Sequence, residues 1–146
     1  MMRTALVHDA IDVLSLLGEV TSPACGASSI FLGTVREQNE GRSVQGIDYS
    51  AYDAMAIRQM DHIAHEAAER FGTEQIVIEH RLGFLALGEV SVAIVVAHAR
   101  RAPAMDATRY IIEELKRRVP VWKREHYDDG SREWIDPTRT YAEMPT

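Results

Sequence analysis

The spacing of apolar residues along this chain predicts three helices and several strands. Apolar positions at helical spacing indicate one helix capped by Asp9 and a second over residues 53–71 that ends at Gly72. A third helix is expected to start at Pro103 and to stop before Pro120. Alternating or continuous apolar segments, which are typical of strands, cover residues 3–7, 27–35, 44–52, 76–82, 90–99, 121–126 and 132–135.

For two of these predicted strands, the sequence also indicates what lies beside them. Residues 36–43 form a polar loop, so we expect the strand at 44–52 to pair back on the strand at 27–35 as a hairpin with a long, mobile loop. The strand at 90–99 is almost entirely apolar, which indicates burial on both faces. In so small a domain, a second copy of the chain is a candidate to cover one of those faces.

Positive charge is concentrated around the proline that ends the third helix. Lys116 falls in the last helical turn. Strand alternation after Pro120 sends Lys123 and Glu125 to one face of the strand. The amines of Lys116 and Lys123 can therefore face one cleft. The formal net charge is −6, yet eight of the sixteen Lys and Arg residues lie between residues 100 and 124, namely Arg100, Arg101, Arg109, Lys116, Arg117, Arg118, Lys123 and Arg124.

Two interpretations of the lysines stay open from this pattern alone. Amines about 4 Å apart at an effective dielectric near 20 repel by roughly 4 kcal/mol, which lowers a lysine pKa by about 3 units and makes a usable base or nucleophile. Alternatively, the cations complement the helix dipole and stay solvated, which is the interpretation we favour for Arg117 and Arg118. Lys116 and Lys123 fit either interpretation.

Arginines mark the expected anion sites. Arg100 and Arg101 directly precede the third helix, whose free N–H groups suit phosphate or carboxylate. Arg36 follows the end of a strand, where loops can meet a ligand. Large aromatics such as Phe31 and Trp122 are core residues more often than platforms for a flat heterocycle. A small anion or an acidic peptide is therefore the expected guest.

Composition narrows the class of protein. With 146 residues, 46% hydrophobic and 26% charged, the chain fits one domain over residues 1–146, with residues 137–146 as a flexible tail. Net acidity argues against a general nucleic-acid binder, and no segment has the length of a membrane span. The single cysteine, Cys25, is consistent with a reducing compartment, so we expect a cytoplasmic protein. His62 and His65 share a helix face, but no metalloprotease-type motif or cysteine pair accompanies them, so we expect no metal site.

Three segments resemble the catalytic, larger subunit of molybdopterin synthase. They are residues 26–36, residues 80–83 and above all the Lys-x-x-x-Pro-x-Trp-Lys-x-Glu segment at residues 116–125. These segments occur in the family's order and spacing, and the similarity covers roughly residues 3–136. The resemblance implies an α+β fold of the hammerhead type, with a mainly antiparallel sheet and helices packed against it.

The resemblance also implies a reaction and its participants. A small ubiquitin-like sulfur-carrier subunit would thread its C-terminal Gly-Gly thiocarboxylate into the pocket. Cyclic pyranopterin monophosphate would receive two sulfurs in successive steps, which form the dithiolene of molybdopterin. The implied assembly is a homodimer built through the sheet, within a heterotetramer that carries one small subunit at each end. No cofactor of the protein's own is implied, because metal is added later by other proteins.

Position by position, the resemblance makes Lys116 and Lys123 the catalytic lysines. It implies that the substrate pocket is formed or supported by Arg36, Arg101, Phe31 and Glu125. The family typically has histidine where this chain has Arg100. Arginine keeps the positive charge, so anion binding by Arg100 survives, but it cannot shuttle a proton near neutral pH.

Two non-catalytic functions also fit a basic pocket. A module that captures an acidic C-terminal tail would retain its partner yet yield no dithiolene product. A regulatory dimer that senses a phosphorylated metabolite would show ligand-dependent melting shifts without any partner protein. Sulfur transfer to the pterin distinguishes the enzyme from both.

Overall fold

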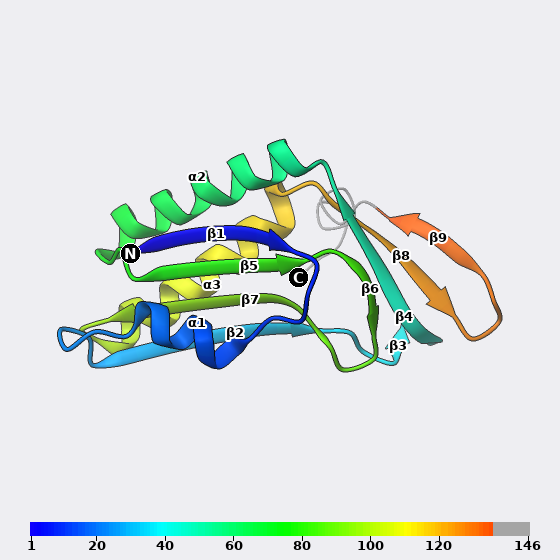
Figure 1. Ribbon diagram of the computed structural model, residues 1–146, viewed down its shortest axis with the longest axis horizontal. Coiled ribbons are helices and arrows are strands. Elements are labelled where there is room, and N and C mark those ends of the chain that lie inside the picture. The colour runs from blue at the N-terminus through cyan, green and yellow to red at the C-terminus, as the bar shows by residue number, and fades with distance from the viewer. Residues whose placement is uncertain (136–146) are drawn as a thin grey trace.

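The computed structural model describes residues 1–135, and Figure 1 shows the order of their elements. The helices of this region are α1 (Val13–Val20), α2 (Asp53–Phe71) and α3 (Arg101–Arg118). Its strands are β1 (Met2–Val7), β2 (Ala27–Thr34), β3 (Gln38–Asn39), β4 (Arg42–Ala51), β5 (Ile76–Arg81), β6 (Gly83–Ala86), β7 (Val90–His98), β8 (Val121–Tyr127) and β9 (Arg132–Ile135). The predicted α+β class is confirmed, whereas the predicted tail at 137–146 lies outside the described residues.

The first sheet has the strand order β1-β5-β7-β2 and is covered on both faces by helices. Its strands are antiparallel except for the parallel pair β1 and β5. Alternate residues of β7 pack toward α2 and α3, or toward α1 on the opposite face. Figure 1 shows α1 in front of this sheet and α3 behind it. Both covers belong to the same chain, so the burial of β7 gives no sign of a second copy.

The second sheet is built around β4, the longest strand. Its order is β3-β4-β8-β9, and β6 pairs with β4 as well. The predicted hairpin between residues 27–35 and 44–52 is therefore wrong, because β2 pairs with β7 in the first sheet. Alternation shows which face of β4 is buried, but it does not identify the strand beside it. The polar segment at 36–43 contains a short hairpin of its own, formed by β3 and the start of β4.

Local sequence signals set the helix ends, and the structure corrects two of the predicted helix starts. The carboxylate of Asp12, not that of Asp9, caps α1 by accepting a hydrogen bond from the backbone N–H of Ser15 at 3.2 Å. Pro103 is the third residue of α3, where it is tolerated because first-turn N–H groups have no partner within the helix. Gly72 ends α2 as predicted, with a left-handed backbone at φ +71°.

Replacement of Gly72 by alanine is expected to lower the free energy of unfolding by about 1 kcal/mol, because a Cβ is strained at that φ. Gly18 provides the matched control, since it lies within α1 and its Cβ position faces open space. Gly18→Ala is expected to stabilise the protein by up to about 1 kcal/mol. Urea unfolding of both variants measures the difference, and effects of the same sign would contradict the left-handed cap.

Candidate active site

The proline after α3 places two lysines on either side of a turn. Pro120 lacks an N–H and disfavours a helical backbone in the residue before it. Val119 is accordingly extended, at φ −90° and ψ 121°, and β8 begins two residues later. Lys116 lies in the last turn of α3, and Lys123 is the third residue of β8, as the sequence pattern predicts.

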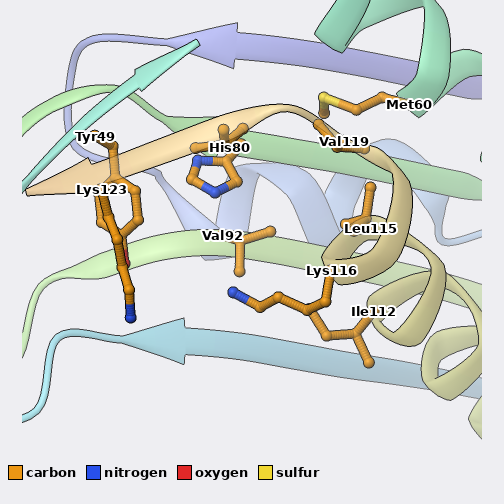
Figure 2. A pocket seen from close by; sticks show the side chains of 10 residues that line it. Tyr49, Met60, His80, Val92, Ile112, Leu115, Lys116, Val119 and Lys123 are labelled. Carbon is orange, nitrogen blue, oxygen red and sulfur yellow. The ribbon is translucent and has the colours of Figure 1, made fainter. Parts of the chain in front are cut away.

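These lysines line two adjoining hollows. One is mostly apolar, with a volume of about 60 Å³, and the other is more polar, with a volume of about 180 Å³. Lys116, Lys123 and Tyr49 line both hollows and therefore form a shared wall, which confirms the predicted common cleft. Figure 2 shows the apolar hollow, into which Lys116 reaches from α3. The polar hollow is lined in addition by Arg36, Asn39, Ser91 and Glu125.

Lys116 has a lowered pKa. Protein atoms surround its amine on most sides, so desolvation is the main cause, and the charge of Lys123 adds to it. Lys116 as a whole is nevertheless an exposed residue, so water reaches its side chain and moderates the effect of desolvation. The lowered pKa of Lys116 agrees with the effect expected of two like charges, but burial lowers it more than repulsion by Lys123 does. Such an amine gives up its proton at a lower pH than a fully solvated lysine does.

Lys123 differs because it has a buried carboxylate as its partner. Its Nζ lies 3.1 Å from Oε1 of Glu125, a residue that is 1% exposed. The other oxygen, Oε2, accepts hydrogen bonds from the hydroxyl of Tyr127 at 2.5 Å and the amide of Asn39 at 2.7 Å. Burial raises the pKa of Glu125, but these hydrogen bonds and the Lys123 charge outweigh it, so the pKa is lowered overall. The carboxylate therefore stays ionised and holds Lys123.

A buried histidine faces the apolar hollow. His80, 8% exposed, has its Nδ1 at 3.0 Å from the backbone oxygen of Arg81, so Nδ1 carries the proton and donates it. Burial, and then the charge of Lys116, lower the pKa of His80 to about 4. The ring packs edge to face against Tyr49, with 5.3 Å between centroids. The hollow therefore contains a neutral imidazole whose Nε2 can accept a hydrogen bond.

Of the predicted substrate-binding residues, Arg36 and Glu125 line the polar hollow, and Phe31 does not. Arg36 lines the polar hollow, and its Nη2 donates to Oδ1 of Asn39 at 3.3 Å. Phe31 packs against the main core of the protein and lines neither hollow. Its aromatic ring thus contributes to packing behind the site, in line with the core interpretation of such residues.

Arg100 and Arg101 lie at the opposite end of α3 from Lys116. Arg101 is the first residue of this helix and Arg100 is its N-cap, and both are exposed. At a rise of 1.5 Å per residue, Arg101 and Lys116 are roughly 22 Å apart along the helix axis. A single chain therefore does not bring these arginines to the lysines.

Comparison with known proteins identifies the family. The family description "MoaE protein" matches residues 6–118. The chain belongs to the MoaE family. A molybdopterin synthase catalytic subunit from Pyrococcus abyssi is 45% identical over 120 residues, which cover 82% of this chain and 80% of that protein.

Two solved structures share the fold of this MoaE family member. Molybdopterin synthase from Staphylococcus aureus is 30% identical, with a TM-score of 0.83 over 89% of this chain and 94% of that one. A complex of subunits 1 and 2 of molybdopterin-converting factor from Helicobacter pylori matches with a TM-score of 0.73 and 24% identity over 90% of this chain and 89% of that one. The second match concerns the fold alone.

Tyr49, His80 and Asn39 are among the pocket residues of this MoaE chain that the sequence-based set of site residues lacks. Tyr49 reaches the pocket because β4 pairs with β8 and places it opposite Lys123. His80 belongs to one of the segments that resemble the family, and its place in that segment was the available signal. Asn39 lies in a polar segment with no periodicity to mark it. Each position depends on strand pairing, which the sequence pattern leaves open.

Two negative findings apply to residues 1–135 of this MoaE chain. No three side chains of His, Cys, Asp or Glu in that region gather where they could hold a metal ion. None of its helices combines the length and the apolar character needed to cross a membrane.

Replacing Lys123 with methionine is expected to raise the pKa of Lys116, because one of the two causes that lower it is removed. The pH dependence of Lys116 acylation, followed by mass spectrometry, measures this change. Arg124→Met is the matched control, since Arg124 pairs with Asp48 on the other face of β8. A Lys116 labelling profile that Lys123→Met leaves unchanged would contradict the proximity of the two amines.

His80 is expected to make the protein less stable as the pH falls from about 6.5 to about 4. Below 6.5 the unfolded chain takes up a proton that the folded chain does not bind until about pH 4, which favours unfolding. Between pH 7 and 4.5, wild type should lose roughly 2 to 3 kcal/mol more unfolding free energy than His80→Gln, which has no group to titrate there. Denaturant unfolding at both pH values measures this, and equal losses would show that the histidine is not held neutral.

Proposed function

We propose that this chain is the catalytic subunit of a molybdopterin synthase. It transfers sulfur from the C-terminal thiocarboxylate of a small ubiquitin-like partner to cyclic pyranopterin monophosphate, which becomes the dithiolene of molybdopterin. The observation that carries the proposal is the pair of lysines lining one pocket, in a chain 45% identical to a molybdopterin synthase catalytic subunit. We place the activity in the cytoplasm, in line with the single cysteine of the chain.

The pocket suits two anionic guests of different shape. We assign the smaller, apolar hollow to the extended Gly-Gly tail, since glycine has no side chain to accommodate. The larger polar hollow, which includes Arg36, fits the phosphate-bearing pterin. The shared wall of Lys116, Lys123 and Tyr49 is where the two guests meet. Sulfur transfer is therefore assigned to this wall.

The two lysines have different roles in this mechanism. Lys116, whose pKa is lowered, acts as the proton-transfer group or as a transient nucleophile while the thiocarboxylate sulfur attacks the pterin. Lys123, held by Glu125, orients the substrate and stabilises the negative charge that develops. The sulfur forms its bond to a pterin carbon while the bond from that carbon to oxygen breaks, and the oxygen leaves with a proton. The bond between the sulfur and the tail carbonyl carbon then breaks, and its electron pair stays on the sulfur as a thiolate. That carbon takes up water, and the tail leaves as a carboxylate.

A homodimer within a heterotetramer completes the proposal. Arg100 and Arg101 lie too far from Lys116 to act on the same guest in one chain, so their anion-binding role requires a second copy. An edge strand of the first sheet, β2, exposes Ile30 and Leu32, which offer an apolar surface for that copy. We place one small partner subunit at each end of the dimer. A complex of two different subunits with this fold supports a partner subunit in general.

Replacing Lys116 with alanine is expected to slow sulfur transfer by 100-fold or more, because a positioned acid–base group is lost. The assay mixes the purified chain with a thiocarboxylated partner and cyclic pyranopterin monophosphate, and follows the dithiolene product by mass. Arg117→Ala is the control, since Arg117 is 59% exposed and pairs with Glu114 on the helix surface. Its rate should equal that of wild type.

One outcome would contradict the enzymatic function, and another would contradict the role given to Lys116. Wild type that retains the thiocarboxylated partner but yields no dithiolene would be a binding module instead. A Lys116→Ala variant as fast as wild type would remove Lys116 from the mechanism. Titration with the pterin alone, followed by thermal melting, tests the regulatory alternative, which predicts stabilisation without any partner.

A further inference from the structure

Asn39 lies at the tip of a short hairpin that reaches back to the pocket. Strand β3 pairs with the start of β4, with Asn39 opposite Arg42. The two residues between them, Glu40 and Gly41, both have positive φ, at +50° and +79°. Two-residue turns with positive φ match the natural twist of paired strands and give a well-defined hairpin. The hairpin thus sets the position of Asn39 beside the polar hollow.

The amide of Asn39 joins two charged groups of opposite sign. Its Nδ2 donates to Oε2 of Glu125 at 2.7 Å, and its Oδ1 accepts from Nη2 of Arg36 at 3.3 Å. A carboxylate can only accept and a guanidinium can only donate, so the orientation of the amide is determined by its partners. A neutral amide makes both hydrogen bonds at once, whereas an ionised carboxylate or a hydrocarbon cannot.

The bond from Asn39 helps to fix the rotation of a buried carboxylate. Oε2 of Glu125 accepts hydrogen bonds from the amide of Asn39 and from the hydroxyl of Tyr127. Oε1 is left to pair with the amine of Lys123. Loss of a donor on Oε2 frees the carboxylate to turn and weakens its hold on Lys123. A shift of about 1 Å in such a group is enough to slow an enzyme substantially.

We propose that Asn39 is a positioning residue for sulfur transfer, acting through Glu125 to hold Lys123 and linking that pair to Arg36 at the anion-binding side of the pocket. Asn39 need not touch the reacting atoms for this role. Its effect on the rate rests on the proposed function, whereas its effect on the Glu125 carboxylate is a property of the chain alone. The two effects can therefore be measured separately.

Asn39→Asp provides the sharpest test. It keeps the shape of the side chain but places a second carboxylate where the amide donates to Glu125, and two carboxylates in such contact share a proton. We expect kcat for sulfur transfer to fall at least tenfold at pH 8 and to recover as the pH falls toward 6. The wild-type profile is measured alongside, because both proteins contain the charged and titratable groups that face this site, namely Arg36, Tyr49, Lys116, Lys123 and Tyr127.

Gln38→Glu is the matched control. It makes the same amide-to-acid change at the neighbouring position of β3, where Gln38 is exposed and lines a different surface hollow. Its kcat and pH profile should equal those of wild type. A loss in Asn39→Asp that is confined to KM, or that Gln38→Glu reproduces, would overturn the proposal, since either result means that added charge merely repels anionic guests.

The second readout does not require activity. The pKa of the Glu125 carboxyl, followed by carbon NMR in the chain alone, should rise in Asn39→Asp and also in Asn39→Ala, because a hydrogen bond that lowers it is lost. Asn39→Ala adds no charge and serves if Asn39→Asp does not fold. An unmoved Glu125 pKa overturns the proposal. If the Glu125 pKa rises in the variants but the wild type transfers no sulfur, the role of Asn39 in holding the Glu125 carboxylate stands. The proposed function is then overturned instead.

Discussion

The inability of Pro120 to continue a helix is the constraint on which the site depends. It ends α3 and sends the chain into β8, so amines that are seven residues apart in sequence reach the same pocket. The local environments of these amines then diverge. Lys123 has an ionised, buried carboxylate beside it, whereas among the described residues no acidic side chain forms an ion pair with Lys116. One turn therefore yields a held cation and an amine with a lowered pKa.

Sequence reasoning succeeded where the signal is local. The αL cap at Gly72, the helix end before Pro120 and the shared face of Lys123 and Glu125 follow from backbone sterics and strand alternation, and all are present. The partner of β4 could not be predicted in this way, because alternation defines a buried face and not a neighbour. Tyr49 and its contact with the lysines therefore emerged only from the fold.

Charge clustering in the sequence proved a weaker guide than strand register. Arg101 and Lys116 lie in one cationic segment, yet a continuous helix places them at its two ends. Conversely, Asn39 and Glu125 are 86 positions apart and form a hydrogen bond of 2.7 Å. The rise of a helix follows from residue numbers. The distance between Arg101 and Lys116 could therefore have been calculated once α3 was extended to Arg101. The closeness of Asn39 could not, since it depends on a hairpin and on two strand pairings.

The wall shared by the two hollows has a thermodynamic consequence. Because Tyr49, Lys116 and Lys123 belong to both compartments, negative charge in one compartment reduces the positive potential that the other presents. Two anionic occupants should thus weaken each other's binding, and linkage makes the factor the same whichever arrives first. In the proposed reaction, the same antagonism would speed the release of the carboxylate tail and of the product, because both are anionic.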